Sequence, residues 1–151
     1  MPPRSLASYR ALFSTLVAPS IDSVRGLYAG ELVGPGWLRR VAPTGLALGG
    51  LRGWWGKEFD GAGGAVNLVL RDGRRVSTLP MAFDARPSLI DGEPAAVLTY
   101  PPTAPFPWRR VADELRRQDD GSLLGLSVLV TPRWARKLAL PFVLRPHPEQ
   151  P

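Results

Sequence analysis

The sequence has no cysteine and a single histidine among its 151 residues. Without cysteine the chain has no disulfide, no thiolate metal ligand and no cysteine nucleophile. The one histidine, His147, lies among prolines near the C-terminus. Counting therefore excludes a site built from several histidines and disfavours a histidine-based triad. We expect no metal and no bound cofactor, and a haem held by His147 is disfavoured.

Long apolar runs are also absent. A membrane-spanning helix needs about 18 uninterrupted apolar residues, and no stretch of the sequence approaches that length, so no span is predicted. Residues 1–18 contain a short apolar run that is broken by polar residues and followed by a poor cleavage site. This pattern does not favour a signal peptide, and we expect a cytoplasmic protein.

Lysine is scarce, because only Lys57 and Lys137 are present, although 19 basic residues against 13 acidic ones give a net charge of +6. A basic chain can bind nucleic acid or anionic lipid. An arginine-rich, lysine-poor composition can also reflect a GC-rich genome. No basic run reaches five residues and the arginines are dispersed, so we favour composition as the explanation and expect no nucleic-acid partner.

Apolar runs of strand length, separated by turn residues, fill most of the chain. Asp72-Gly73, Asp91-Gly92 and Asp119-Asp120-Gly121 are hairpin turns of this kind. The predicted strands span 25–33, 51–59, 65–71, 74–83, 94–100, 108–118, 122–130 and 138–145. Without sustained alternation of strands and helices, this pattern predicts an all-β, mainly antiparallel barrel or sandwich.

Helical periodicity is limited to short segments. Residues 5–18 form an amphipathic pattern with Ser5 as N-cap and Pro19 as terminator. Residues 37–42 predict one or two helical turns ended by Pro43, and 44–50 is either a second short helix or a loop. Segment 132–137 predicts a further helical turn. We expect an N-terminal helix and connector at 1–24, a β domain at 25–145 and a disordered tail at 146–151.

Two adjacent indoles mark the strand at 51–59. Strict alternation places Trp55 and Lys57 on one face and Trp54 on the other. We therefore expect Trp55 to share the interior with Lys57, while Trp54 is covered from outside. Two packing tryptophans, without any role in a site, are the simpler alternative.

Charges occupy both faces of the strand that contains Asp113-Glu114-Leu115-Arg116-Arg117. Whichever face points inward brings charge with it, and buried charge is costly unless it is paired or faces a wet cavity. Two interpretations remain open. The strand is an exposed edge with solvated charges, or the interior carries a carboxylate–guanidinium set beside Lys57.

An ordered set of motifs over 25–145 resembles the bacterial and fungal GXWXG-type domains of unknown function. The motifs are Gly26-Leu27-Tyr28-Ala29-Gly30, Trp54-Trp55-Gly56-Lys57-Glu58-Phe59, Ile90-Asp91-Gly92, Asp113-Glu114-Leu115-Arg116, Leu124-Gly125 and Phe142-Val143-Leu144-Arg145. Tyr28 replaces the expected tryptophan, and 34–50 is a longer intervening segment. The resemblance implies a single small lipocalin-like β-barrel and no established activity. By analogy with such barrels, we expect Arg145 to stack on Tyr28 in a cation–π contact.

Three kinds of function remain open. The first is a binding barrel for a small, mostly apolar or amphipathic ligand with an anionic end; its predicted site residues are Tyr28, Trp55, Lys57, Tyr100, Asp113, Glu114 and Arg116. The second is a cofactor-independent enzyme, such as an isomerase or cyclase, with Lys57 or Tyr28 as acid/base and Asp113 or Glu114 as partner. The third is an interaction module or homodimer that exposes Trp37, Trp108 and Trp134.

Overall fold

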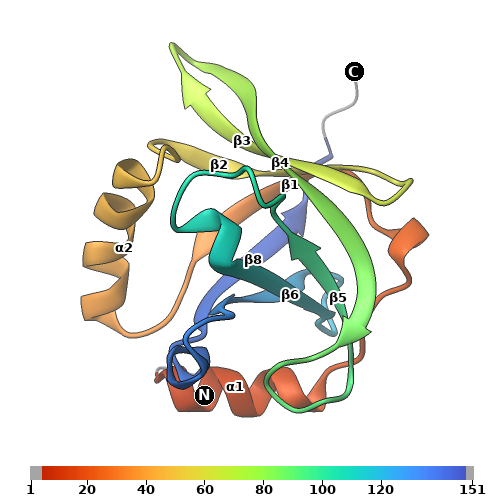
Figure 1. Ribbon diagram of the computed structural model, residues 1–151. Helices are drawn as coiled ribbons and strands as arrows, with labels where there is room; N and C mark the ends of the chain where they lie inside the picture. Colours follow the sequence, from red (N-terminus) through yellow and green to blue (C-terminus); the bar gives the residue numbers. More distant parts are fainter. Residues whose placement is uncertain (1–4, 149–151) are drawn as a thin grey trace.

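The computed structural model describes residues 5–148, and within that range eight strands form one closed antiparallel barrel (Figure 1). The all-β prediction is confirmed. The strands are β1 (Arg25–Leu32), β2 (Trp54–Asp60), β3 (Gly64–Arg71), β4 (Arg74–Pro87), β5 (Pro94–Thr99), β6 (Val111–Arg117), β7 (Leu123–Leu129) and β8 (Leu140–Pro146).

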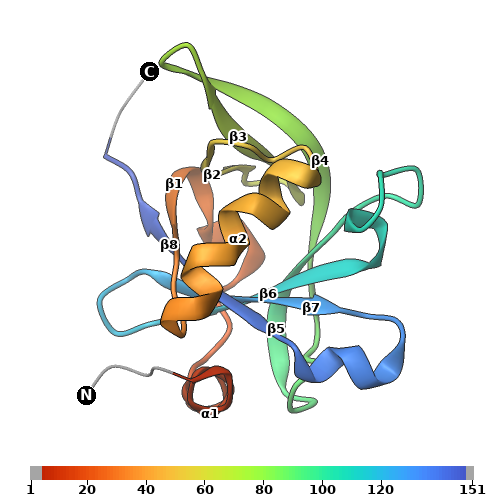
Figure 2. The same ribbon diagram turned by 90° about the vertical axis from the view of Figure 1, so that its left-hand side faces the viewer.

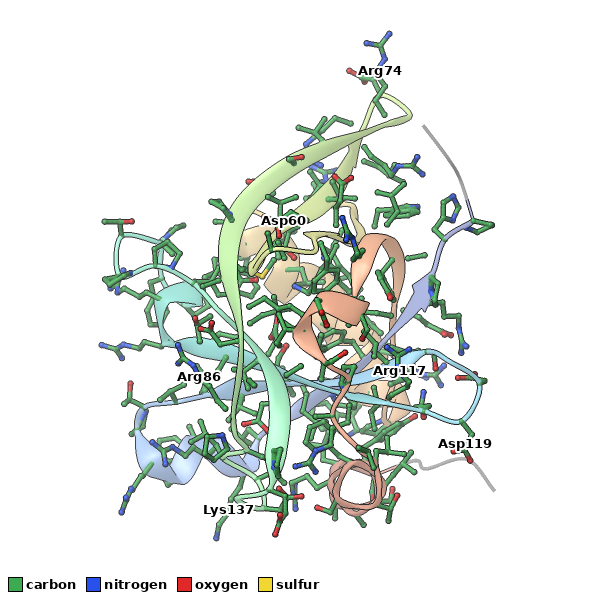
Figure 3. The ribbon with its side chains drawn as sticks, turned by 90° about the vertical axis from the view of Figure 1, so that its right-hand side faces the viewer. Asp60, Arg74, Arg86, Arg117, Asp119 and Lys137 are labelled. Atoms are coloured by element: carbon green, nitrogen blue, oxygen red, sulfur yellow. The ribbon has the colours of Figure 1, made fainter. Side chains whose placement is uncertain are left out.

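Each strand pairs with its neighbours in sequence, and β1 pairs with β8 to close the barrel. The tight turn between β3 and β4 has positive φ at Asp72 (51°) and Gly73 (77°), as a two-residue hairpin requires. That hairpin projects from the barrel, with Arg74 at its tip (Figure 3). Closure gives every strand two neighbours, but the part of β4 before Ala82 pairs with β3 alone, because its pairing with β5 begins at Ala82.

The apolar residues form two cores, one on each side of the sheet. The first lies inside the barrel and includes Phe59, Leu98 and Leu115. The second lies outside, over β5 to β8, and includes Leu124, Leu126 and Val128. Alternate residues of β7 thus enter different cores, as the pleat of a strand requires.

Helix α1 (Leu6–Thr15) covers the outer core beneath the barrel (Figure 1). Ser5 caps it, since its side chain accepts a hydrogen bond from the Ser8 backbone N–H, and Tyr9 and Phe13 are its buried residues. The predicted helix and its N-cap are confirmed. The helix ends at Thr15, earlier than predicted, and Val17 bridges to Arg117 of β6 instead.

Helix α2 (Gly36–Leu48) connects β1 to β2 in the chain and lies across one side of the barrel (Figure 2). The prediction that Pro43 ends a short helix is wrong, because Pro43 lies inside one continuous helix. Leu38, Ala42 and Leu46, spaced four apart, are its least exposed side chains and continue past the proline. A continuous apolar face thus persists where a local stop signal predicts an end.

Three 3₁₀ helices complete the described chain: η1 (Ile21–Ser23), η2 (Trp108–Arg110) and η3 (Arg133–Lys137). Trp108, expected to be exposed, is buried, and its Nε1 donates to the Gly49 carbonyl oxygen at 2.6 Å. Trp37 and Trp134 are exposed, as expected. None of the helices within 5–148 is long and apolar enough to cross a membrane.

The predicted closure contact between Arg145 and Tyr28 is wrong. Arg145 points outward and forms ion pairs with Glu31 (3.6 Å) and Asp120 (3.2 Å). The cross-strand partner of Arg145 is Ala29, so these two residues share the outer face. Tyr28, the neighbour of Ala29 in β1, therefore points inward. Strand β8 continues to Pro146, the first residue of the predicted disordered tail, and the His147 N–H donates to the Leu27 carbonyl oxygen. Residues 149–151 of that tail lie outside the described residues.

A β-bulge interrupts the pairing of β2 with β3 between Trp54 and Gly56. At Gly56 the backbone of β1 approaches so closely that an added Cβ would lie 2.0 Å from the Tyr28 carbonyl oxygen. Gly30 similarly leaves room for the Trp54 ring, 2.3 Å from a Cβ built there. The need for space at Gly30 and Gly56 explains why glycines lie beside aromatic residues in the motifs at 26–30 and 54–59.

Replacing Gly56 by alanine should destabilise the barrel by about 1–3 kcal/mol, because the backbone of Tyr28 cannot easily move away. Urea unfolding measures the change in the free energy of unfolding. Gly45→Ala is the matched control, since Gly45 lies in α2 with nothing within 4 Å of an added Cβ. The control should be neutral or stabilising by about 0.5–1 kcal/mol. Equal losses in both variants would contradict this explanation.

Candidate functional site

Three polar side chains meet inside the barrel, where apolar packing would otherwise be expected. Lys57, Asn67 and Asp113 come from β2, β3 and β6, and all three are buried. Lys57 Nζ lies 3.1 Å from Asp113 Oδ2 and donates to Asn67 Oδ1 at 2.8 Å. The alternation of each strand turns these residues inward at neighbouring positions, with Lys57 directly opposite Asn67.

Three further residues complete the hydrogen bonds of this set. Ser127 Oγ donates to Asp113 Oδ1 at 2.7 Å, and Trp54 Nε1 donates to Asn67 Oδ1 at 3.1 Å. Asn67 Nδ2 donates to Tyr100 Oη at 2.9 Å. We call Trp54, Lys57, Asn67, Tyr100, Asp113 and Ser127 the polar cluster.

The ammonium group of Lys57 has apolar and aromatic surroundings. Its Nζ lies 5.8 Å from the ring centroids of both Trp54 and Phe142, and 3.6 Å from Met81 Sδ. Cation–π attraction and the Asp113 carboxylate offset the cost of removing the charge from water. Lys57 and Asp113 together carry no net charge.

Tyr100 is held as a neutral hydroxyl. Burial raises the pKa of Tyr100 above its ordinary value, and the nearby negative charge of Asp113 raises it further, although the hydrogen bond from Asn67 acts in the opposite direction. A neutral phenol can donate its own proton in a hydrogen bond.

A small cavity of about 40 Å³ adjoins the polar cluster, whose six residues all line it. Outside it lies a larger groove of about 460 Å³ beneath α2, which we call the α2 groove. The small cavity and the groove share five lining residues: Leu32, Leu46, Trp108, Ser127 and Phe142. The small cavity beside the polar cluster is therefore adjacent to a mainly apolar groove.

The structure brings together three of the predicted site residues, Lys57, Tyr100 and Asp113. Tyr28 is also inside the barrel, but its ring packs edge-on against Phe59, with ring centroids 5.3 Å apart, and it does not line the small cavity. Burial raises the pKa of Tyr28, while the charge of Arg117 lowers it.

The prediction that Trp55 shares the interior face with Lys57 is wrong. The β-bulge reverses the alternation, so Trp54 lies beside Lys57 inside the barrel. Trp55 instead contacts the Arg75 guanidinium, 4.6 Å from its ring centroid, and the ring of His147 at 5.1 Å.

Glu114 and Arg116 point away from the cavity but are also buried, so the interpretation of an exposed edge strand is wrong. The Glu114 carboxylate accepts hydrogen bonds from Ser88 Oγ and the Leu89 N–H. Burial raises its pKa, although these hydrogen bonds act in the opposite direction. Arg116 pairs with Asp91 and donates to the Phe13 carbonyl oxygen of α1. These outer residues join α1 to the β4–β5 connection.

Asn67, Ser127 and Trp54 were not among the predicted site residues. Asn67 and Ser127 each interrupt an otherwise apolar strand, and a polar side chain that is buried needs a hydrogen-bonding partner. They could have been found by that argument. Trp54 could not, because nothing in the alternation reveals the bulge. Among residues 5–148, no three His, Asp or Glu side chains are grouped so as to hold a metal ion.

The barrel resembles a crystal structure of a protein from Thermomonospora curvata, with a TM-score of 0.68 and 22% sequence identity. The match covers 96% of this chain and 90% of that one. At this identity the likeness shows a shared fold and nothing about activity. No protein-family model and no curated protein matches the chain. The resemblance to GXWXG-type domains thus remains a prediction.

Breaking the interior ion pair should cost about 3 kcal/mol of unfolding free energy in either Lys57→Met or Asp113→Leu, because each leaves a buried charge without its partner. The double variant should lose less than the sum, with a coupling energy of about 2 kcal/mol. The exposed pair Arg145 and Glu31 provides the control cycle, where coupling of at most about 0.5 kcal/mol is expected. Additive losses at the interior pair would contradict the argument.

The ion pair of Asp91 with Arg116 should stabilise the fold in a pH-dependent way. Hydrogen bonding to Arg116 lowers the pKa of Asp91, so the folded state favours the carboxylate. Its contribution is complete above the unfolded-state pKa, about 4, and is lost as the pH falls below it.

Asp91→Asn should therefore reduce the unfolding free energy by about 3 kcal/mol at pH 7 and by clearly less at pH 3. Denaturant unfolding at both pH values measures this difference. Asp84→Asn, which breaks an exposed pair with Arg86, is the control and should change stability by at most about 0.5 kcal/mol. A loss that is independent of pH would exclude the ion pair as its cause.

Proposed function

We propose that the protein binds a small, mainly apolar molecule in the α2 groove, with the polar part of that molecule at the polar cluster. The adjacency of the groove and the small cavity, which share five lining residues, carries this proposal. A mainly apolar pocket with a few convergent polar groups is the common form of a small-molecule site.

The size and lining of the groove support this function. Its volume of about 460 Å³ lies within the range of about 300–1,000 Å³ that is usual for ligand pockets. Leu38, Ala42 and Leu46 of α2 line one side, and Leu129 and Leu140 of the barrel line the other. An apolar ligand would thus be enclosed between helix and barrel.

Acid/base catalysis in the same cavity is the second candidate. It is supported by the closeness of Lys57 to Asp113 beside the neutral hydroxyl of Tyr100. The geometry favours binding over catalysis, because the ammonium hydrogens of Lys57 already have three partners. A compound that the unmodified protein converts, and that the Lys57→Met variant binds without converting, would favour the catalytic function.

Filling the groove should weaken binding. Ala42→Trp places an indole in the α2 groove, and we expect it to weaken the affinity for the neutral fluorescent probe N-phenyl-1-naphthylamine at least about tenfold. Ala47→Trp, on the exposed side of the same helix, is the matched control and should change the affinity less than about twofold. Probe fluorescence titration measures both.

No saturable binding by the unmodified protein would refute the proposed function. Equal weakening by both variants would show that the probe binds elsewhere or that α2 has been disturbed generally. Circular dichroism of each variant checks that the barrel is intact.

A further inference from the structure

We propose that the polar group of the ligand is uncharged and accepts a hydrogen bond from the Tyr100 hydroxyl, as a ketone, ester or amide carbonyl does. This inference rests on the proposed function, since it concerns the small cavity adjacent to the same groove. It differs from the expectation of an anionic ligand.

The orientation of the Asn67 side chain determines what Tyr100 can do. Lys57 Nζ and Trp54 Nε1 are donors only, and both lie against Asn67 Oδ1. The amide nitrogen of Asn67 must therefore face Tyr100, and it donates to Tyr100 Oη at 2.9 Å. Tyr100 thus accepts from Asn67, so its own proton is available to a different partner.

No acceptor for that proton occurs among the hydrogen bonds of the described residues, although Tyr100 lines the small cavity. The cavity volume of about 40 Å³ exceeds the volume that a single water requires, about 10–15 Å³. The cavity therefore has room for a carbonyl group beside the phenol. Such an acceptor would complete the hydrogen bonding of Tyr100.

The charges of the polar cluster disfavour an ionised ligand. The hydrogens of Lys57 Nζ are directed to Asp113, Asn67 and Met81, so none is left to pair with an incoming anion. A carboxylate would also lie close to Asp113, which lines the same cavity. A ligand cation would compete with Lys57 for Asp113. Either charge would lose its hydration without gaining a free counter-charge.

Ligands with one chain length and different polar groups test this inference. Decan-2-one, decanoate, decylammonium and decane would compete with N-phenyl-1-naphthylamine at pH 7. We expect decan-2-one to bind about fivefold more tightly than decane, which corresponds to one net hydrogen bond. We expect it to bind at least about tenfold more tightly than either charged compound.

Tyr100→Phe isolates the proposed hydrogen bond, because it removes the hydroxyl and keeps the ring. It should abolish the advantage of decan-2-one over decane and leave the affinity for decane unchanged. Tyr28→Phe is the matched control, since Tyr28 is an interior tyrosine that does not line the small cavity. It should retain the preference for the ketone.

The outcomes separate the two proposals. Tightest binding of decanoate, or a ketone preference that survives in Tyr100→Phe, would overturn the inference while leaving the groove as the binding site. Failure of all four compounds and of the probe to bind would overturn the proposed function and this inference together. If Tyr100→Phe does not fold, the ranking of the four compounds in the unmodified protein still decides between a neutral and a charged group.

Discussion

The buried ion pair between Lys57 and Asp113 constrains the whole interior of the barrel. Removing two charges from water is costly, and their attraction compensates only when the remaining hydrogen bonds are also made. Asn67 from β3 and Ser127 from β7 supply those bonds, so four strands must present a polar side chain near one level. An interior with this requirement cannot be filled by apolar packing alone, and the small cavity lies at that place.

The bulge in β2 is part of the same arrangement. By reversing the alternation, it brings the Trp54 indole inside, where its N–H bonds to Asn67 and its ring flanks the Lys57 ammonium. Gly30 and Gly56 permit this by leaving space for the ring and for the backbone of β1. The change of strand face explains why the two adjacent indoles have different surroundings.

Local patterns in the sequence predicted much of this fold, and their failures have a common physical cause. The hairpin turns and the strand segments follow from residue types and spacing. The buried charge near Lys57 was one of two interpretations that the sequence left open. The face of Trp55 and the course of α2 do not follow from local patterns, because both depend on contacts distant in sequence. A bulge is set by cross-strand packing, and the burial of Leu46 continues the helix beyond Pro43.

Strand β6 shows why charged residues alone do not locate a site. Asp113 faces the barrel interior, whereas its neighbour Glu114 and the nearby Arg116 face outward, and all three are buried. The outer pair is enclosed by backbone groups and by Asp91, which leaves it a role in attaching α1.

The inner carboxylate adjoins a cavity that is adjacent to an apolar groove, and a tyrosine hydroxyl lines the same cavity. The charged side chains on both faces of β6 have partners, so charge pairing does not show which face has a binding site. Only the inner side has open volume next to a hydroxyl whose proton has no acceptor among the described residues. This difference, rather than the charged residues themselves, is the basis for the proposal that a ligand's polar group binds on the inner side.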